Sequence, residues 1–129
     1  MKIQESAENY LETILILGKR KGDVHSIDIA LELEYSKPSV SVAMKKLREN
    51  GYIAVDGEGN LTLLEPGREI AERIYSRHRL LTHFFMQLGV DEKTAAEDAC
   101  KAEHILSEQT LEKIRESALR TDAAAQEDE

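Results

Sequence analysis

The pentapeptide CKAEH, residues 100–104, places three types of metal-binding side chain within little more than one helical turn. Cys100, Glu103 and His104 stand at positions i, i+3 and i+4, and side chains at this spacing project from one face if the segment is helical. Thiolate, imidazole and carboxylate are the common protein ligands of divalent transition metals. The motif therefore predicts part of a metal site, and the remaining ligands must come from other elements.

Two other predicted helices supply candidates for those ligands. His78 falls on the apolar stripe of a long helix, and Glu12 lies one turn beyond Asn9 on a helix near the N-terminus. Each group also has a simpler interpretation. Cys100 fits as a small buried apolar residue, and His78 fits as a core histidine bonded to a carbonyl. A metal site is favoured because the groups fall on three separate helices.

The composition bounds the class of protein. The chain has 129 residues, of which 41% are hydrophobic, and it has one cysteine. That length fits one domain, or one domain with a small extension, and a lone cysteine excludes an internal disulfide framework. The sequence shows neither an apolar run of transmembrane length nor a signal-like start. A soluble cytoplasmic protein that does not associate with a membrane is expected.

Charge is unevenly distributed along the chain. The formal net charge is −8, which argues against indiscriminate nucleic-acid binding. The segment 121–129 carries four acidic residues and no basic one, whereas segment 36–50 has a local excess of three positive charges. An acidic chain with one basic patch is still able to bind DNA through that patch.

Hydrophobic periodicity predicts a mostly helical chain with one hairpin. Ser26, Asp91 and Ser107 are predicted N-caps, and Pro38 and Pro66 stand where a first helical turn tolerates proline. The hairpin strands are YIAVD and NLTLLE, joined around GEGN. The predicted helices cover residues 6–20, 27–34, 38–50, 66–88, 92–105 and 108–120.

Two short helices separated by a tight turn and followed by a hairpin predict a winged helix-turn-helix. The second of these helices combines a buried face with a small, polar, basic face that suits a major groove. Val42 is an exposed apolar candidate for contact with a thymine methyl group. The hairpin tip carries Asp56 and Glu58 and no basic residue, so a weak wing contact is expected. The candidate DNA-binding residues are Ser36, Lys37, Pro38, Ser39, Ser41, Val42, Lys45 and Lys46.

Over about residues 5–120 the chain resembles the diphtheria-toxin-repressor family of metal-dependent transcriptional regulators. The resemblance rests on ENYLETILIL, SKPSVSVAMKKLRENGYI, LTLLEPGREIAERIYSRHRLLTHFF and DACKAEHILSE. It implies a mainly α fold: a winged helix-turn-helix DNA-binding domain (1–65) and a helical metal-binding and dimerisation domain (66–120). The acidic composition of the remaining segment predicts a disordered tail (121–129). The resemblance also implies a homodimer that binds double-stranded palindromic operator DNA, acts as a repressor, and has no SH3-like domain.

The resemblance further implies a ligand set that mixes two branches of the family. Asn9 stands where the manganese branch has aspartate and the iron branch has methionine. Cys100 matches the iron branch, whereas Glu12 and His78 match the manganese branch. The implied ion is iron(II) or manganese(II), with cobalt, nickel or zinc able to substitute. The implied ligands are Asn9, Glu12, His78, Cys100, Glu103 and His104.

Three alternatives belong to other functional classes. A redox-sensing winged-helix regulator would use Cys100 as a thiol sensor. A winged-helix protein with a purely structural zinc would unfold on removal of the metal. A small metalloenzyme would need an open coordination position and a base; no such base accompanies the ligands, so the chain is not expected to be an enzyme.

Overall fold

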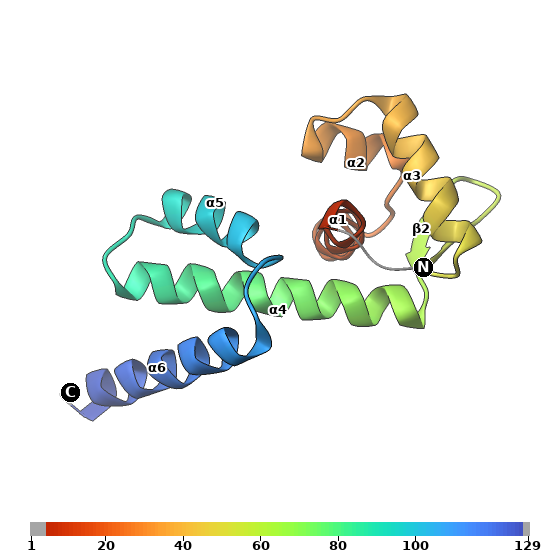
Figure 1. Ribbon diagram of the computed structural model, residues 1–129. Helices are drawn as coiled ribbons and strands as arrows, with labels where there is room; N and C mark the ends of the chain where they lie inside the picture. The colour runs from red at the N-terminus through yellow and green to blue at the C-terminus, as the bar shows by residue number, and fades with distance from the viewer. Residues whose placement is uncertain (1–4, 128–129) are drawn as a thin grey trace. The chain divides into compact units, whose positions relative to one another are not determined.

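The computed structural model describes residues 5–127, with side chains to residue 120, and it is mainly helical with one small sheet, as predicted (Figure 1). The elements in chain order are α1 (Glu5–Lys21), α2 (Ser26–Leu33), α3 (Lys37–Glu49), β1 (Ile53–Val55), β2 (Leu61–Leu63), α4 (Glu65–Gln87), α5 (Glu92–Ala102) and α6 (Glu108–Glu127).

The chain forms two compact units. The first ends at Arg73 and the second begins at Ile74, so their boundary lies inside helix α4. The predicted domain boundary between residues 65 and 66 instead coincides with the start of this helix. Pro66 marks where a helix begins, but a helix start does not mark the edge of a packed unit.

The first unit is a helix-turn-helix followed by a hairpin. Helix α1 packs on α2 and β2, and α3 packs on α2 and β1. Its core contains Leu11, Ile29, Val40 and Ile53, each 0 or 1% exposed. These positions are apolar at helical spacing or on the inward face of a strand, which is why the sequence pattern identified the elements.

The start of α2 differs from the prediction. His25, not Ser26, is the N-cap, because the carboxylate of Asp28 accepts a hydrogen bond of 2.8 Å from the His25 backbone N–H. Lys21 then pairs with the same carboxylate at 2.7 Å. An acidic residue at the third helical position that bonds back to the cap fixes the helix start, so Ser26 falls inside the first turn.

The start of α3 depends on Ser36. The Ser36 hydroxyl oxygen accepts a bond of 3.3 Å from the Ser39 backbone N–H, and Pro38 lies in the first turn of the helix. The Ser36 hydroxyl also donates to the Ser39 hydroxyl at 2.8 Å. This cap satisfies one of the backbone donors that a helix start leaves without an internal partner.

The hairpin pairs two short antiparallel strands, with Ile53 opposite Leu63 and Val55 opposite Leu61. The Leu61 N–H also donates to the Val24 carbonyl at 2.8 Å. This bond ties the hairpin to the loop that precedes α2. The wing and the helix-turn-helix therefore belong to one packed unit.

Gly67 provides a stability test of the first unit. A Cβ atom added there would lie 2.2 Å from the Tyr52 carbonyl oxygen, so we expect Gly67→Ala to cost about 1–3 kcal/mol, as overpacking does. Gly18→Ala is the matched control because no atom lies within 4 Å of the added Cβ. The control should stabilise α1 by roughly 0.5–1 kcal/mol through helix propensity. Urea denaturation measures both, and equal stability of the two variants would contradict this account.

The second unit combines the rest of α4 with α5 and α6, which flank it in Figure 1. Leu81, Ala99 and Leu111 come from these three helices and form its buried apolar cluster. Several partly buried side chains pack around this cluster: Leu80, Phe85, Ala102, Leu106 and Ile114.

Two helix ends in this unit differ from the prediction. Helix α5 was expected to reach residue 105, but it ends at Ala102 with Glu103 as its C-cap. The Ile105 N–H bonds to the Ala102 carbonyl at 3.1 Å, and this shorter spacing tightens the chain into a turn. Helix α6 was expected to end near Arg120 and give way to disorder, but it continues to Glu127. The run TDAAAQE contains three alanines, which favour helix despite the acidic composition.

Within residues 5–127, the structure has no helix that combines the length and apolar character needed to cross a bilayer.

Candidate functional site

Glu103 lies at the centre of the candidate metal site in the second unit. Its carboxylate is fully buried, and Oε2 lies 2.9 Å from Nδ1 of His78. Oε1 lies 3.4 Å from Nε2 of His104, whose side chain is 1% exposed. The structure thus brings together three of the predicted ligands, one from α4 and two from the turn after α5.

This arrangement fits a divalent metal. A buried carboxylate is costly unless it is paired. Here Oε2 is hydrogen-bonded to His78, whereas Oε1 is buried without a hydrogen-bond partner among the described residues and lies 3.4 Å from the His104 nitrogen. Two imidazoles and one carboxylate supply nitrogen and oxygen donors of the kind that iron(II) uses, and oxygen donors also suit manganese. These three side chains could hold such an ion in place of the contacts they now make with one another.

Cys100 does not share the environment of this cluster. It lies on α5 and is exposed, whereas Glu103 is fully buried. Because the helix ends at Ala102, the chain turns before His104, and the predicted common helical face does not extend over all three residues.

The two remaining predicted ligands lie on α1, in the first unit. Asn9 and Glu12 are three residues apart in the helix, so they project from similar directions. Glu12 is 6% exposed, an unusual burial for a carboxylate. The Asn9 backbone carbonyl accepts a bond of 2.7 Å from the Thr13 hydroxyl, so its side-chain amide is not the group engaged there.

Arg77 is a site residue that the sequence reading missed. It precedes His78 on α4, donates to the Glu103 backbone carbonyl at 3.2 Å, and forms an ion pair with Glu108. The only signal in the sequence was its place in the SRHRLL segment. An arginine on a helix is usually a solvated surface residue, so the pattern alone gave no reason to select it.

Asp91 is the N-cap of α5, the helix that leads to Glu103. Its contribution to stability should depend on pH. Two hydrogen bonds hold the pKa of Asp91 below its ordinary value. The larger effect comes from the Thr94 hydroxyl and the smaller from the Thr94 backbone N–H. A lowered folded pKa stabilises the protein above the unfolded pKa, which is about 3.9, and this stabilisation is lost as pH falls through the folded pKa. We expect the parent to melt above Asp91→Asn at pH 7 and to lose that advantage below pH of about 4. A constant difference between their melting temperatures from pH 7 to 3 would refute this.

The candidate DNA-binding face is the outer surface of α3. All eight predicted contact residues are exposed, and the opposite face buries Val40, Met44 and Leu47. Val42 is 56% exposed, so its methyl groups are accessible to a thymine methyl group. Ser36 and Ser39 already serve the helix cap, which leaves Ser41 as the hydroxyl on α3 that is not engaged in that cap.

A pocket of about 220 Å³ on the first unit extends this face. Its lining brings two hydroxyls and two cationic side chains together: Ser26, Ser41, Met44, Lys45, Arg48 and Val55. Hydroxyls and cations suit a backbone phosphate. Ser26 and Arg48 were not among the predicted contacts. Ser26 was predicted to be a helix cap, and Arg48 was placed on the polar face of α3 without being assigned to DNA.

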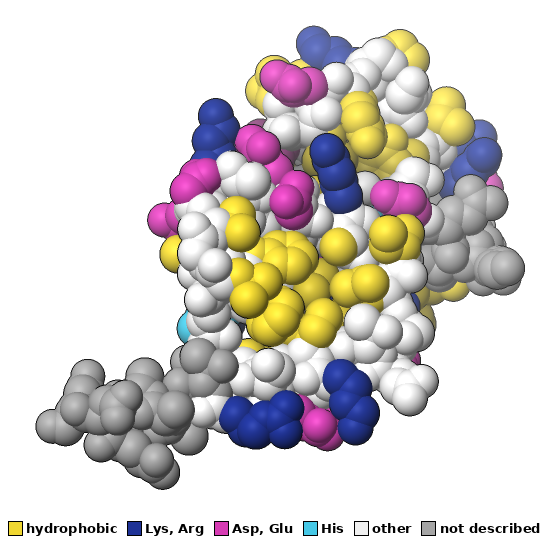
Figure 2. Space-filling model, turned by 60° about the vertical axis from the view of Figure 1, so that its left-hand side comes forward, with side chains coloured by type: hydrophobic (Ala, Val, Ile, Leu, Met, Phe, Trp, Pro, Cys, Tyr) yellow, Lys and Arg dark blue, Asp and Glu magenta, His cyan; other side chains and the backbone are white. Residues whose placement is uncertain are grey.

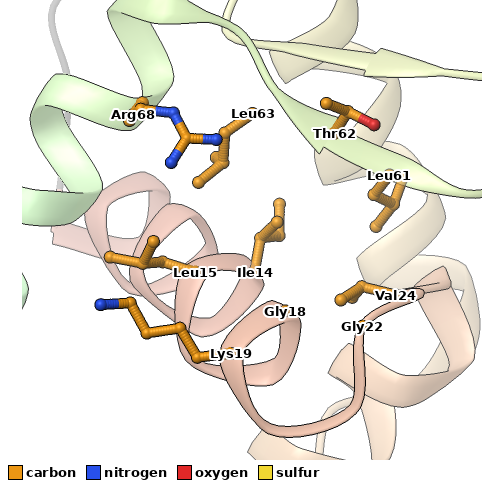
Figure 3. A pocket seen from close by; sticks show the side chains of 10 residues that line it. All are labelled: Ile14, Leu15, Gly18, Lys19, Gly22, Val24, Leu61, Thr62, Leu63 and Arg68. Carbon is orange, nitrogen blue, oxygen red and sulfur yellow. The ribbon is translucent and has the colours of Figure 1, made fainter.

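A second pocket of the first unit, about 320 Å³, is not a metal site (Figure 3). Its floor is apolar and comes from α1, Val24 and β2, with Lys19 and Arg68 at one end. No carboxylate, imidazole or thiol lines it. The apolar side chains that line it are each under 9% exposed, so they offer a ligand little surface.

Exposed apolar side chains also characterise the second unit. Figure 2 turns the side of Figure 1 that carries α5 and α6 toward the viewer, and it shows hydrophobic side chains gathered into a patch. The exposed large apolar residues of this unit are Met86, Leu88, Ile105 and Leu119. A contiguous apolar surface of this kind typically marks a protein–protein interface.

Comparison with known families matches both halves of the chain. Residues 2–61 match the N-terminal DNA-binding domain of the iron-dependent repressors. Residues 64–121 match the metal-binding and dimerisation domain of the same family. Helix α3 therefore falls in the first domain, and the cluster around Glu103 falls in the second.

Individual relatives agree with this match. A helix-turn-helix transcriptional regulator of Methanocaldococcus jannaschii is 36% identical over 88% of this chain and 92% of its own length. The transcriptional regulator MntR of Lysinibacillus sphaericus is 34% identical over 84% of this chain and 78% of its own. A manganese-dependent transcriptional repressor solved with manganese has a TM-score of 0.80 at 27% identity. That match covers 87% of this chain but only 52% of the repressor, so this chain spans about half its length. These matches do not support the redox-sensor, structural-zinc or enzyme alternatives.

Proposed function

Because this chain belongs to the family of iron-dependent repressors, we propose that it is a cytoplasmic repressor whose binding to operator DNA depends on a divalent metal. The observation that carries the proposal is the buried Glu103 carboxylate between the imidazoles of His78 and His104. This site follows α3 in the chain, and α3 is an exposed basic helix suited to the major groove. The chain thus combines a metal-binding centre with a DNA-reading surface.

The proposed ligands come from both domains. Glu103, His78 and His104 are the ligands of the second domain, and Cys100 is a further candidate there. Asn9 and Glu12 are the proposed ligands from α1. Iron(II) or manganese(II) is the proposed physiological ion because the donor set is dominated by oxygen and nitrogen, with cobalt, nickel or zinc as substitutes.

The proposed mechanism is a population shift. A bound divalent ion supplies the positive charge that offsets the carboxylates. Asn9 and Glu12 would be the residues of α1 that share the ion with the ligands of the second domain, and this sharing would restrict the orientation of α3 relative to the dimer. The free energy available equals the difference in metal affinity between joined and separated domains.

The proposed DNA target is a palindromic operator bound by a homodimer. Two recognition helices related by a two-fold axis read half-sites about one helical turn apart, or a multiple of that distance. The apolar side chains of the second unit, Met86, Leu88, Ile105 and Leu119, are the proposed dimer surface. A fixed spacing between the two DNA-binding domains would make the dimer select operators whose half-sites have the same spacing.

The deciding experiment selects the operator and then varies the metal. Random DNA duplexes are enriched on the full chain with manganese(II), and the recovered sequence is labelled for fluorescence anisotropy. Binding is measured anaerobically with manganese(II), iron(II), cobalt(II), nickel(II) and zinc(II), and with chelator. We expect tight binding only with metal and a two-fold symmetric selected sequence. Equal binding with chelator would refute metal dependence, and a chelator-induced loss of the folded state would indicate a structural metal instead.

A further inference from the structure

Arg77 contacts the backbone of a proposed metal ligand instead of the metal site itself. Its side chain is 15% exposed. One guanidinium nitrogen, Nη1, donates to the Glu103 carbonyl oxygen at 3.2 Å. The other, Nη2, forms an ion pair with the carboxylate of Glu108. Arg77 thus spans the end of α5 and the start of α6 from a position next to His78 on α4.

The Glu103 carbonyl is a group that needs such a partner. The last carbonyls of a helix have no partner within the helix, and Glu103 is the C-cap of α5. A guanidinium satisfies this acceptor with a charge-assisted bond and also complements the negative end of the helix dipole. The bond therefore fixes the backbone of the residue whose side chain lies between the two imidazoles.

Apolar packing alone would not fix the orientation of the turn that carries Glu103 and His104. Leu106 packs against the apolar cluster of the second unit, which keeps the turn close to α4. Burial of apolar surface is non-directional, so it does not set the rotation of the turn. The hydrogen bond to the Glu103 carbonyl is directional and acts on the segment that also carries His104.

We infer that Arg77 is a positioning residue that holds the 103–107 turn on α4, so that Glu103 and His104 face His78 before metal arrives. This inference rests on the proposed function and adds a determinant of metal affinity. The hydrogen bond to the Glu103 carbonyl, and not the ion pair with Glu108, should determine the effect of Arg77 on metal affinity. The Glu108 side chain is 80% exposed, and such surface ion pairs contribute little.

The test uses the full chain and cobalt(II) as the probe ion. Calorimetry gives the cobalt(II) affinity, the cobalt absorption spectrum reports ligand geometry, and metal-free melting reports stability. Arg77→Gln should weaken cobalt(II) binding about 10- to 100-fold, as loss of a partner that orients ligands does, and should change the spectrum. Arg77→Lys keeps a cationic donor and should lose less affinity than Arg77→Gln.

Two control variants distinguish the carbonyl hydrogen bond of Arg77 from its ion pair and from the loss of a positive charge near His78. Glu108→Gln removes only the ion pair, and Arg79→Gln removes an exposed arginine on the other side of His78. Both should bind cobalt(II) within about twofold of the parent, as surface substitutions do. If Arg77→Gln matches the parent in affinity and spectrum and only melts earlier, Arg77 is merely structural and the inference is overturned. If the parent itself does not bind cobalt(II), or if His104→Ala binds it as well as the parent, the proposed function is overturned as well.

Discussion

Replacing Glu103 with glutamine should weaken manganese(II) or iron(II) binding about 10²- to 10³-fold and abolish metal-dependent operator binding. Glutamine keeps the volume of the side chain but removes the buried negative charge that faces His78 and His104. In the metal-bound state Glu103 and the ion would form a buried charge pair. Removing one partner of such a pair costs about 3–5 kcal/mol, and each 1.4 kcal/mol is about tenfold in affinity. The expected loss is therefore large even though no atom is deleted from the core.

Thermal stability gives an independent readout of the same change. At a metal concentration 100 times the dissociation constant, the parent should gain about 2.7 kcal/mol of stability. If affinity falls a hundredfold, the variant should gain only about 0.4 kcal/mol at that concentration. The free energy of unfolding with and without metal measures both values.

Glu97→Gln is the matched control for this experiment. Glu97 is an exposed carboxylate on α5, so its loss changes the net charge by the same amount without touching the buried cluster. We expect its metal affinity and operator binding to equal those of the parent. If Glu103→Gln also binds metal like the parent, the metal centre lies elsewhere in the chain.

The sequence predicted the pairing of His78 with Glu103 better than it predicted the local geometry. His78 was selected because it falls on the apolar stripe of a long helix, and that stripe faces the rest of the second unit. Periodicity indicates which face of a helix is buried. It therefore allowed a contact to be predicted between residues 25 positions apart in the chain. It did not report where α5 ends, because neither glycine nor proline marks that end.

The missing stop signal has a chemical consequence at the site. With α5 ending at Ala102, Cys100 remains on an exposed helical surface and His104 follows in the turn. The donors that the structure brings together around Glu103 are nitrogen and oxygen atoms.

The helix-turn-helix shows a similar limit at Glu34. This residue adopts a left-handed conformation, with φ of 58°, at the C-cap of α2. Glycine or asparagine is the usual signal for that conformation, so the sequence predicted that this helix extends through residue 34. The order of elements and the exposed face of α3 were nevertheless predictable, because they depend on periodicity over many residues and not on one backbone angle.

Replacing Lys45 and Lys46 together with alanine should lower operator affinity on the order of 10³-fold at 0.15 M salt and make binding less dependent on salt. Both lysines are exposed on α3, and in a homodimer they would contact four phosphates. Each phosphate contact contributes about 0.9 to the slope of log affinity against log salt. The slope should therefore be shallower by about 3.6 in the variant, as anisotropy titrations from 50 to 300 mM salt would show.

The control for this pair is the double variant Lys93→Ala and Lys101→Ala. These lysines are exposed on α5, so their loss changes the net charge equally but removes no charge from α3. If electrostatic attraction acted only through net charge, both double variants would weaken binding alike, and α3 would not be the DNA-reading helix. A change of slope confined to the α3 variant, with metal affinity unaltered, would separate DNA contact from metal sensing, because the lysines of α3 lie in a different domain from Glu103.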